Sequence, residues 1–242
     1  MAPARARESI NERQTTRMPE AARATDTRML APIVEIDRLV STSPEPHSVA
    51  TDGRTVWIGS RATRRIDVMN AETWQKTGEI VPPGMPWGMT FASGALVMTC
   101  GETEDDARRV RRFVPETGFE ASFVACPEDT GSHLGLYGDR VLLGQWYNKA
   151  LHLLDENGGV LRTYPAPHGI AGVAVVDHSA YLLGTDDEDE GEYWITRLNL
   201  ENGAAVDVAV VPFRARSLAW DGSRFWTNHR EADRTVTFAL PA

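Results

Sequence analysis

The hydrophobic and polar positions of this chain follow one pattern of short strands that is repeated along the sequence. In residues 46–60 an apolar segment, His47–Thr51, is followed by the turn Asp52-Gly53 and a second apolar segment, Thr55–Ser60. Variants of this pattern begin at Trp87, His133, Gly172 and Arg216. Short apolar segments joined by Asp-Gly and similar turns are typical of β-hairpins. A repeat of about 40–45 residues with four such strands predicts a β-propeller.

Each copy of the pattern predicts an antiparallel four-stranded sheet, except the last copy, which predicts three strands. The expected strands are, in the first copy, His47–Thr51, Thr55–Ser60, Arg65–Met69 and Gly78–Val81; in the second, Trp87–Phe91, Ala95–Cys100, Arg109–Val114 and Phe119–Val124; in the third, His133–Tyr137, Arg140–Gln145, Ala150–Leu154 and Val160–Tyr164; in the fourth, Gly172–Val176, Ala180–Thr185, Tyr193–Leu198 and Ala205–Val211; and in the fifth, Arg216–Trp220, Arg224–Asn228 and Thr235–Leu240.

The segment Ala31–Leu39 alternates apolar and polar residues and supplies the strand that the last copy lacks. Pairing it there closes the ring and removes an exposed sheet edge. We therefore expect an all-β fold, a five-bladed β-propeller over residues 31–242. A six-bladed propeller and an open sandwich are the alternatives. Residues 1–30 show no strand alternation and are expected to be a disordered tail, with a short amphipathic helix over Pro19–Arg28 as the alternative.

Composition and charge exclude several classes of function. The 242 residues carry a net charge of −9 and are 42% hydrophobic, which argues against general disorder and against binding to nucleic acid or anionic membranes. No apolar stretch approaches the ~20 residues of a membrane helix, and the start of the chain lacks the apolar core of a signal peptide. The two cysteines make no disulfide framework. We expect a cytoplasmic protein, and the sequence leaves its oligomeric state open.

The predicted propeller gathers polar and aromatic residues on one face, because loops before the inner strands and loops between second and third strands lie there together. Binding and catalytic residues are commonly carried by such loops on a rigid scaffold. The candidates for catalysis are His133, His47 and His168. The candidates for contact with a substrate are Trp87, Arg216, Arg61, Gln145, Trp146, Asn148, His229 and Glu102.

These residue types favour acid–base chemistry on a small polar or carboxylated molecule. One neutral histidine can remove a proton while a second donates one. Arg216 and Arg61 would hold a carboxylate, and Trp87 and Trp146 would pack the body of the substrate. This arrangement suits a lyase, an isomerase or a cyclase. The alternative is a non-catalytic propeller that binds a ligand or a protein on the same face, where exposed aromatic residues would mark a partner surface.

Two further chemistries are compatible with the same face. The first is a metal-dependent enzyme in which His47, His133 and His168 bind a divalent metal ion, with His229 or Glu102 completing the coordination. No local spacing such as HxH or HExxH supports it, so no residue is assigned as a metal ligand and the cofactor is left unknown. The second is a nucleophilic thiol at Cys100, at a strand end beside a channel histidine, although a lone cysteine is more often a small buried hydrophobic residue.

An acidic run, Thr185–Glu192, falls in the loop between the second and third strands of the fourth copy. It lacks the spacing of a calcium-binding loop. We expect a solvated, mobile loop, with a flap over the site or a weak cation site as alternatives.

Short patches of the sequence resemble known propellers. The run Pro167–Ala174 (PHGIAGVA) resembles a segment of streptogramin lyase and NHL-type propellers, and Leu143–Trp146 and Pro86–Thr90 are similar to segments of five-bladed glutaminyl cyclases. The resemblance implies the fold and the functional face. It does not carry the reaction, because streptogramin lyases have seven blades and the cyclases place an acidic residue at the start of the last inner strand, where this chain has Arg216–Ala219.

Overall fold

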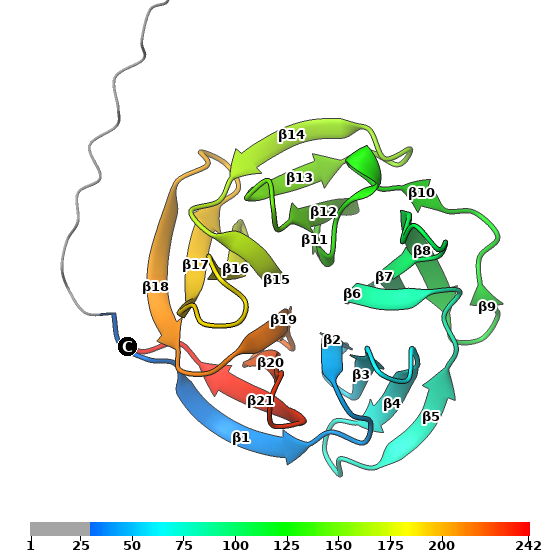
Figure 1. The fold of residues 1–242 in the computed structure, drawn as a ribbon, viewed down its shortest axis with the longest axis horizontal. Helices are drawn as coiled ribbons and strands as arrows, with labels where there is room; N and C mark the ends of the chain where they lie inside the picture. Colours follow the sequence, from blue (N-terminus) through cyan, green and yellow to red (C-terminus); the bar gives the residue numbers. More distant parts are fainter. Residues whose placement is uncertain (1–29) are drawn as a thin grey trace, which may run out of the picture.

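The computed structural model describes residues 30–242, and these form five antiparallel sheets arranged as blades around one axis (Figure 1). The predicted all-β, five-bladed propeller is confirmed. The described residues contain no α-helix, and η1, Pro127–Asp129, is a single short 3-10 turn. Residues 1–29 lie outside the described residues. The expected tail (1–30), apart from Leu30, and the alternative helix at 19–28 therefore lie outside them too. Within residues 30–242 no helix combines the length and apolarity needed to span a bilayer.

The strands follow the predicted order, and most ends differ from prediction by no more than three residues. Blade 1 contains β2 (Pro46–Thr51), β3 (Thr55–Ser60), β4 (Ile66–Asn70) and β5 (Lys76–Ile80); blade 2 contains β6 (Met85–Ala92), β7 (Ala95–Gly101), β8 (Arg108–Val114), β9 (Gly118–Phe119) and β10 (Val124–Ala125); blade 3 contains β11 (His133–Tyr137), β12 (Arg140–Gln145), β13 (Ala150–Leu154) and β14 (Val160–Pro165); blade 4 contains β15 (Gly169–Val176), β16 (Ser179–Thr185), β17 (Tyr193–Asn199) and β18 (Ala205–Val211); and blade 5 contains β19 (Ala215–Trp220), β20 (Phe225–His229), β21 (Arg234–Ala239) and β1 (Val34–Val40).

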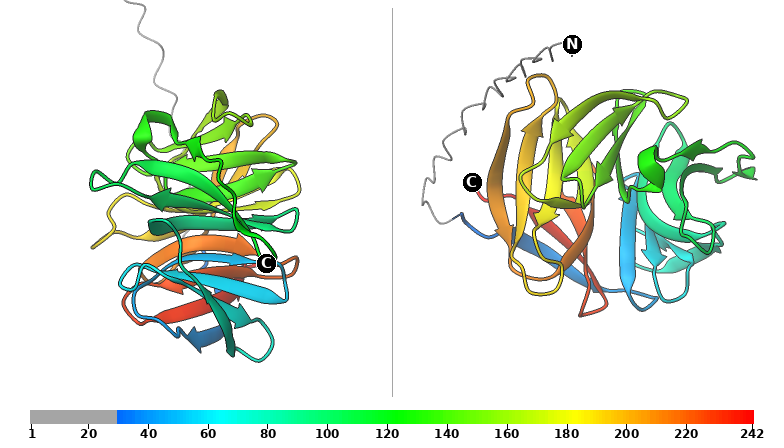
Figure 2. Two further views of the ribbon diagram at one scale, coloured as in Figure 1. Left: turned by 90° about the vertical axis from the view of Figure 1, so that its right-hand side faces the viewer. Right: turned by 45° about the horizontal axis from the view of Figure 1, so that its top comes forward.

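The N-terminal strand closes the ring as predicted. β1 pairs antiparallel with β21 at the outer edge of blade 5, and Figure 2 shows the two strands side by side from two further directions. The carboxylate of Asp37 accepts hydrogen bonds from Arg224 Nη1 at 2.7 Å and from Thr237 Oγ1 at 3.1 Å. The backbone N–H of Ile33 donates to the carbonyl of Val210 at 2.9 Å, which ties the same segment to blade 4.

The outer strand of blade 2 is the one clear departure from the prediction. A continuous strand was expected over Phe119–Val124, but the chain pairs with β8 only at β9 and β10 and leaves the sheet between them. The ring of Phe123 lies against the guanidinium groups of Arg109 and Arg111, at 4.3 and 4.6 Å from their carbons. This cation–π contact replaces strand pairing for that segment.

The core lies between neighbouring blades, where the apolar faces of the sheets pack together. Trp57 of blade 1 stacks on Phe91 of blade 2 with ring centroids 4.7 Å apart. Tyr181 of blade 4 lies 5.1 Å from Phe225 of blade 5. Each sheet is therefore buried on both faces by its neighbours, as aromatic and aliphatic packing between sheets requires.

Small residues near the start of the inner strands let the blades approach each other around the axis. A Cβ added at Gly88 would lie 2.0 Å from the carbonyl oxygen of Ser132 in the next blade. A Cβ added at Gly172 would lie 2.6 Å from the carbonyl carbon of Ser217. Both glycines follow a register irregularity in their strand, which brings the backbone toward the neighbouring blade.

Serines make comparable contacts at two other inner strands, β2 and β19. Ser48 Oγ donates to the carbonyl of Pro86 at 3.0 Å, joining blade 1 to blade 2. The backbone N–H of Val49 donates to Ser217 Oγ at 3.0 Å, joining blade 1 to blade 5. The inner ring is therefore closed by small side chains whose polar atoms are satisfied across blade boundaries.

We expect Gly88→Ala to destabilise the propeller, because the new methyl group would overlap backbone that cannot move without shifting a whole blade. The expected loss in the free energy of unfolding is about 1–3 kcal/mol, measured by urea denaturation. Gly78→Ala on the outer strand β5 is the control, since its Cβ would lie 3.7 Å from Val68, an ordinary contact. Equal stability of both variants would contradict this account of ring closure.

Candidate functional site

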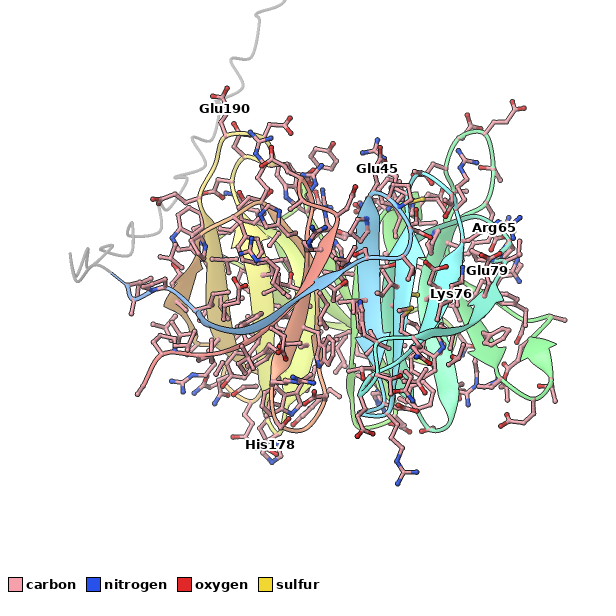
Figure 3. All side chains as sticks on the ribbon, turned by 90° about the horizontal axis from the view of Figure 1, so that it is seen from below. Glu45, Arg65, Lys76, Glu79, His178 and Glu190 are labelled. Carbon is pink, nitrogen blue, oxygen red and sulfur yellow. The ribbon has the colours of Figure 1, made fainter. Side chains whose placement is uncertain are left out.

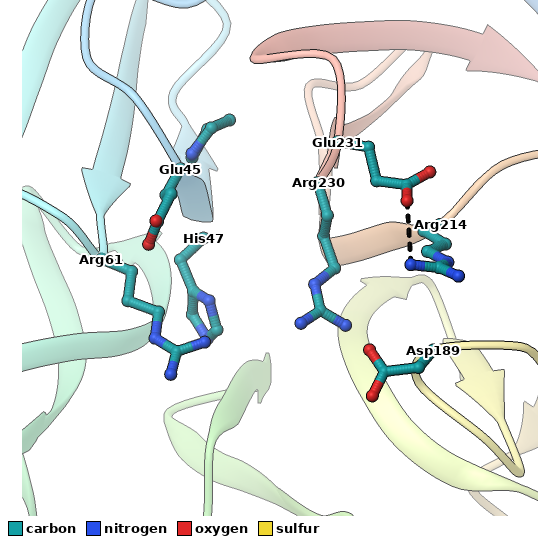
Figure 4. A pocket seen from close by; sticks show the side chains of 8 residues that line it. Glu45, His47, Arg61, Asp189, Arg214, Arg230 and Glu231 are labelled. Carbon is teal, nitrogen blue, oxygen red and sulfur yellow. Dashed lines mark ion pairs between the residues drawn. The ribbon is translucent and has the colours of Figure 1, made fainter.

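The predicted face carries two adjacent pockets at the mouth of the central channel. The larger, here called the mouth pocket, has a volume of about 490 Å³. It is lined by His47, Arg61, Trp87, Arg108, Ser132, Trp146, Tyr147, Asp186, Asp187, Glu188, Asp189 and Arg216. The smaller, here called the side pocket, has a volume of about 390 Å³ (Figure 4). It is lined by Glu45, Pro46, His47, Arg61, Asp189, Arg214, Arg230 and Glu231.

The two pockets share His47, Arg61 and Asp189, so they form one continuous concave region. Figure 4 shows Arg61 and Arg230 on opposite sides of the side pocket, with the Arg214–Glu231 ion pair next to Arg230 on the side away from Arg61. Figure 3 places Glu45 and Glu190 on this face of the propeller and His178 on the opposite face.

Two predicted catalytic histidines, His47 and His133, lie together at the start of the inner strands β2 and β11. Their side chains are almost fully buried, and the ring centroids are 6.4 Å apart. Among the described residues no hydrogen-bond partner is found for Nε2 of His47 or for either ring nitrogen of His133. Buried polar atoms are normally paired, so these nitrogens lack the usual compensation. His47 lines both pockets, whereas His133 lines neither and lies behind it in the protein interior.

Both imidazoles are neutral at physiological pH. Burial lowers the pKa of His47 well below its usual value, and the nearby charge of Arg216 lowers it further. Burial and the same arginine act in the same direction on the pKa of His133. A neutral imidazole has one donor and one acceptor nitrogen, so the pair can give one proton and accept another.

Arg216 lies beside the histidines at the start of β19 and is 6% exposed. Its Nη2 donates to the carboxylate of Glu188, while its Nε has no partner among the described residues. Arg230 Nη1 lies 3.3 Å from the same Glu188 oxygen. A buried guanidinium with a free donor is a strong site for an anion.

Other arginines surround the mouth pocket. Arg61 has no ion-pair partner within residues 30–242. Arg108 is held by Asp106 at 2.6 Å and by the carbonyl of Gly131 at 2.9 Å, and its guanidinium lies 3.9 Å from the ring centroid of Trp87. The pocket therefore contains three arginines drawn from blades 1, 2 and 5.

Aromatic side chains form the apolar part of the lining. The ring of Trp87 meets His47 edge-on at 5.0 Å, and its Nε1 donates to Asp106 at 2.9 Å. Trp146 lies close to the backbone of Gly169, and its buried Nε1 has no partner among the described residues. Tyr147, which packs edge-on against Trp146, is 86% exposed.

The third predicted catalytic histidine, His168, lies in a different environment and lines neither pocket. Its ring nitrogens contact Asp186 at 3.1 Å and Asp207 at 3.2 Å, and the ring stacks on Trp194 at 4.1 Å. Burial alone would lower the pKa of His168, but the hydrogen bonds with the two carboxylates outweigh burial and raise it. The structure therefore separates His168 from the His47–His133 pair.

The structure also places four of the predicted substrate contacts outside both pockets, namely Glu102, His229, Gln145 and Asn148. Glu102 is bound by Arg111 at 2.5 Å and by Arg109 at 3.1 Å, and the hydrogen bond from Arg111 lowers its pKa. His229 stacks on Phe213 with ring centroids 4.6 Å apart. These side chains have protein partners that the sequence pattern could not reveal.

Gln145 and Asn148 belong to a local network in blade 3. Gln145 Nε2 donates to the carbonyl of Pro127 at 3.1 Å, and its Oε1 accepts from Asn148 at 2.8 Å. The same oxygen lies 3.0 Å from His152 Nε2. The network anchors the loop that follows β12, which carries Trp146, so these residues support the mouth without lining it.

The structure does not form the two other predicted sites. Cys100 is fully buried in the core between blades 1 and 2, and burial raises the pKa of its thiol to about 12, so the nucleophilic thiolate is not available. Within residues 30–242 no group of three or more His, Cys, Asp or Glu side chains is arranged to hold a metal ion. The four histidines proposed as ligands do not converge.

Sequence reasoning missed Arg108 and left Arg230 and Glu188 unassigned. Arg108 is the first residue of β8, and third strands begin on the same face as the loops that precede them. That rule was available from the repeat alignment. The contact of Glu188 with blade 5 was not, because it depends on the fold of a loop between β16 and β17.

Comparison with known proteins supports the fold alone. No protein-family model matches the chain, and no curated protein matches it. Hydrazine synthase of Kuenenia stuttgartiensis is similar in structure with a TM-score of 0.52 and 15% identity, over 79% of this chain and 57% of that one. The PQQ-bound form of aldose sugar dehydrogenase from Streptomyces coelicolor is similar with a TM-score of 0.53 and 12% sequence identity. The match covers 86% of this chain and 98% of that one.

The chain thus spans little more than half of the hydrazine synthase chain. At these identities the likeness confirms the fold-level resemblance to propellers, and it places enzymes among the structural neighbours. It carries no substrate or reaction to this protein.

We expect the stability of the protein to fall on acidification because His47 and His133 stay neutral when folded. In the unfolded chain both histidines take up protons below about pH 6.5. Each histidine therefore lowers the free energy of unfolding by up to about 1.4 kcal/mol for every pH unit below that value. The double variant His47→Gln/His133→Gln should therefore lose stability less steeply between about pH 7 and pH 5, in urea titrations at each pH.

The control is His168→Gln, whose effect should have the opposite sign. The raised pKa of His168 adds stability at low pH that is lost as pH rises through that pKa, so its removal should steepen the loss on acidification. The same slope in wild type and the double variant would show that the buried pair is not held neutral.

Proposed function

We propose that the mouth pocket binds a small carboxylated molecule and acts on it by acid–base chemistry, as a lyase, an isomerase or a cyclase. The observation that carries this proposal is the pair of buried imidazoles with unpartnered nitrogens, His47 and His133, beside the free Nε of Arg216. Buried, unsatisfied groups of this kind cost stability, which favours a functional reason for them. The cytoplasmic location expected from the sequence remains a prediction.

The chemistry follows from the charges at the site. A substrate carboxylate bound to Arg216 would place the carbon next to it near His47, which lines the same pocket. One histidine would then accept a proton from that carbon and the other would protonate the leaving or receiving atom. A bound anion also offsets the charge of Arg216, which now lowers the pKa of both imidazoles. Binding would therefore make the base stronger at the moment it is needed.

The second candidate is a propeller that binds a ligand or a protein on this face without catalysis. The exposed ring of Tyr147 beside Trp146 favours it, because aromatic residues are enriched at the centres of protein interfaces. A binding protein would use the same arginines, but it would not depend on the histidine pair for any chemical step. The two proposals therefore differ in what loss of a histidine does.

We expect small carboxylates to bind at Arg216. Titration with acetate, malate and succinate, followed by NMR, should give binding that the neutral diamide of succinate does not show. Arg216→Gln should weaken it by about tenfold or more, as expected for one charge-assisted contact. Arg54→Gln is the control, since Arg54 lies in the Asp52–Thr55 turn at the far end of strand β2 from His47. Equal weakening by both variants would point to screening by net charge rather than a site.

Catalysis should appear as exchange of the carbon-bound proton next to the carboxylate for deuterium in D₂O. In His133→Gln and in His47→Gln this exchange should fall by about 10²–10⁴-fold while binding is retained, because only proton transfer is removed. His178→Gln is the matched control, since that side chain is exposed on the opposite face (Figure 3). Binding of carboxylates with no exchange in wild type would favour the non-catalytic alternative.

A further inference from the structure

All the acidic residues that line the mouth pocket come from one loop. Asp186, Asp187, Glu188 and Asp189 belong to the segment 186–192 between β16 and β17, here called the acidic loop. The cations of the pocket come from other blades. Without the acidic loop, the mouth pocket would present arginines and no carboxylate.

Within this loop Glu188 makes the deepest contact. Its carboxylate pairs with buried Arg216 and lies 3.3 Å from Arg230. One carboxylate oxygen, Oε2, is shared by the two guanidinium groups, and the carboxylate of a bound organic acid could take the same position. The contact leaves Arg216 Nε and His47 Nε2 unpartnered, although both side chains are more than nine-tenths buried and line the same pocket.

The loop is held in place independently of the Glu188 carboxylate. Tyr193 Oη donates to the carbonyl of Glu188 at 2.8 Å, and Arg230 Nη1 contacts the same carbonyl at 3.3 Å. Thr185 Oγ1 donates to the carbonyl of Asp187 at 2.7 Å, and the N–H of Gly191 donates to the same oxygen at 3.1 Å. Neutralising the Glu188 side chain should therefore leave the loop folded.

We propose that Glu188 is an internal ligand that occupies the carboxylate subsite of the substrate, and that a substrate carboxylate binds by displacing it. This inference rests on the proposed function, since it concerns the same pocket. It assigns the substrate class as a short organic acid, whose carboxylate takes the place of the Glu188 group on Arg216 and Arg230. A second acidic group of the substrate would reach Arg61, which lines both pockets. Short dicarboxylates therefore fit best.

The test is the affinity for succinate in Glu188→Gln. While Glu188 occupies the subsite, succinate can bind only to the fraction of molecules in which the subsite is free, and its apparent affinity is reduced by that fraction. Removing the charge of Glu188 should therefore lower the dissociation constant for succinate by about tenfold. Glu190→Gln is the matched control. This substitution removes the same charge from the same loop, but the Glu190 side chain is exposed to solvent (Figure 3). It should bind succinate as the wild type does. Isothermal titration calorimetry measures both.

Three outcomes overturn the inference. An unchanged or weaker affinity in Glu188→Gln would show that this side chain positions Arg216 rather than competes for it. An equal gain in Glu190→Gln would reduce the effect to net charge. If succinate binds neither the wild type nor Glu188→Gln, the carboxylate subsite does not exist.

The variant Arg216→Gln distinguishes failure of this inference from failure of the proposed function. If the wild type binds succinate and Arg216→Gln weakens that binding, but Glu188→Gln shows no gain, this inference alone is overturned. Binding that Arg216→Gln leaves unchanged overturns the proposed function itself.

Discussion

The close approach of five sheets around one axis is the constraint on which the rest of this structure depends. Four of the five inner strands carry a small residue, Ser48, Gly88, Gly172 or Ser217, where they contact the neighbouring blade. The same approach brings the first side chains of the inner strands together and removes them from water. Polar residues at those positions must then find partners or remain unsatisfied. The packing that closes the ring therefore also determines which polar groups at the mouth are buried without a partner.

The environment, rather than the residue type, decides what each histidine at the mouth can do. His133 is buried near arginines and is neutral, whereas His168 is held between two carboxylates and has a raised pKa. Arg216 illustrates the same rule, because burying its charge is costly and the carboxylate of Glu188 offsets that cost. The acidic loop is thus part of the electrostatic balance of the propeller, and any anion that enters the mouth must compete with it.

The repeat pattern was sufficient to predict the fold, since strands β11, β12, β13 and β18 begin where the alternation begins and β1 closes the ring as expected. It predicted the functional face for the same reason, because a fixed repeat puts equivalent loops on one side. It did not predict which side chains point into the pocket. Glu102 and Gln145 have the right sequence position, but salt bridges and hydrogen bonds turn them to local partners. Such pairings depend on neighbours that are distant in sequence.

Closing the ring with β1 has a consequence for the order in which the protein folds. Asp37 and Thr237 are in contact although 200 residues separate them, so blade 5 requires both ends of the propeller. The entropy of closing so long a loop grows slowly with length, but contacts of this range form late. Until β21 has been synthesised, β1 has no partner and β18 and β2 border an open gap. The ring therefore forms last, and during synthesis those edges are the ones that need protection from misplaced strand pairing.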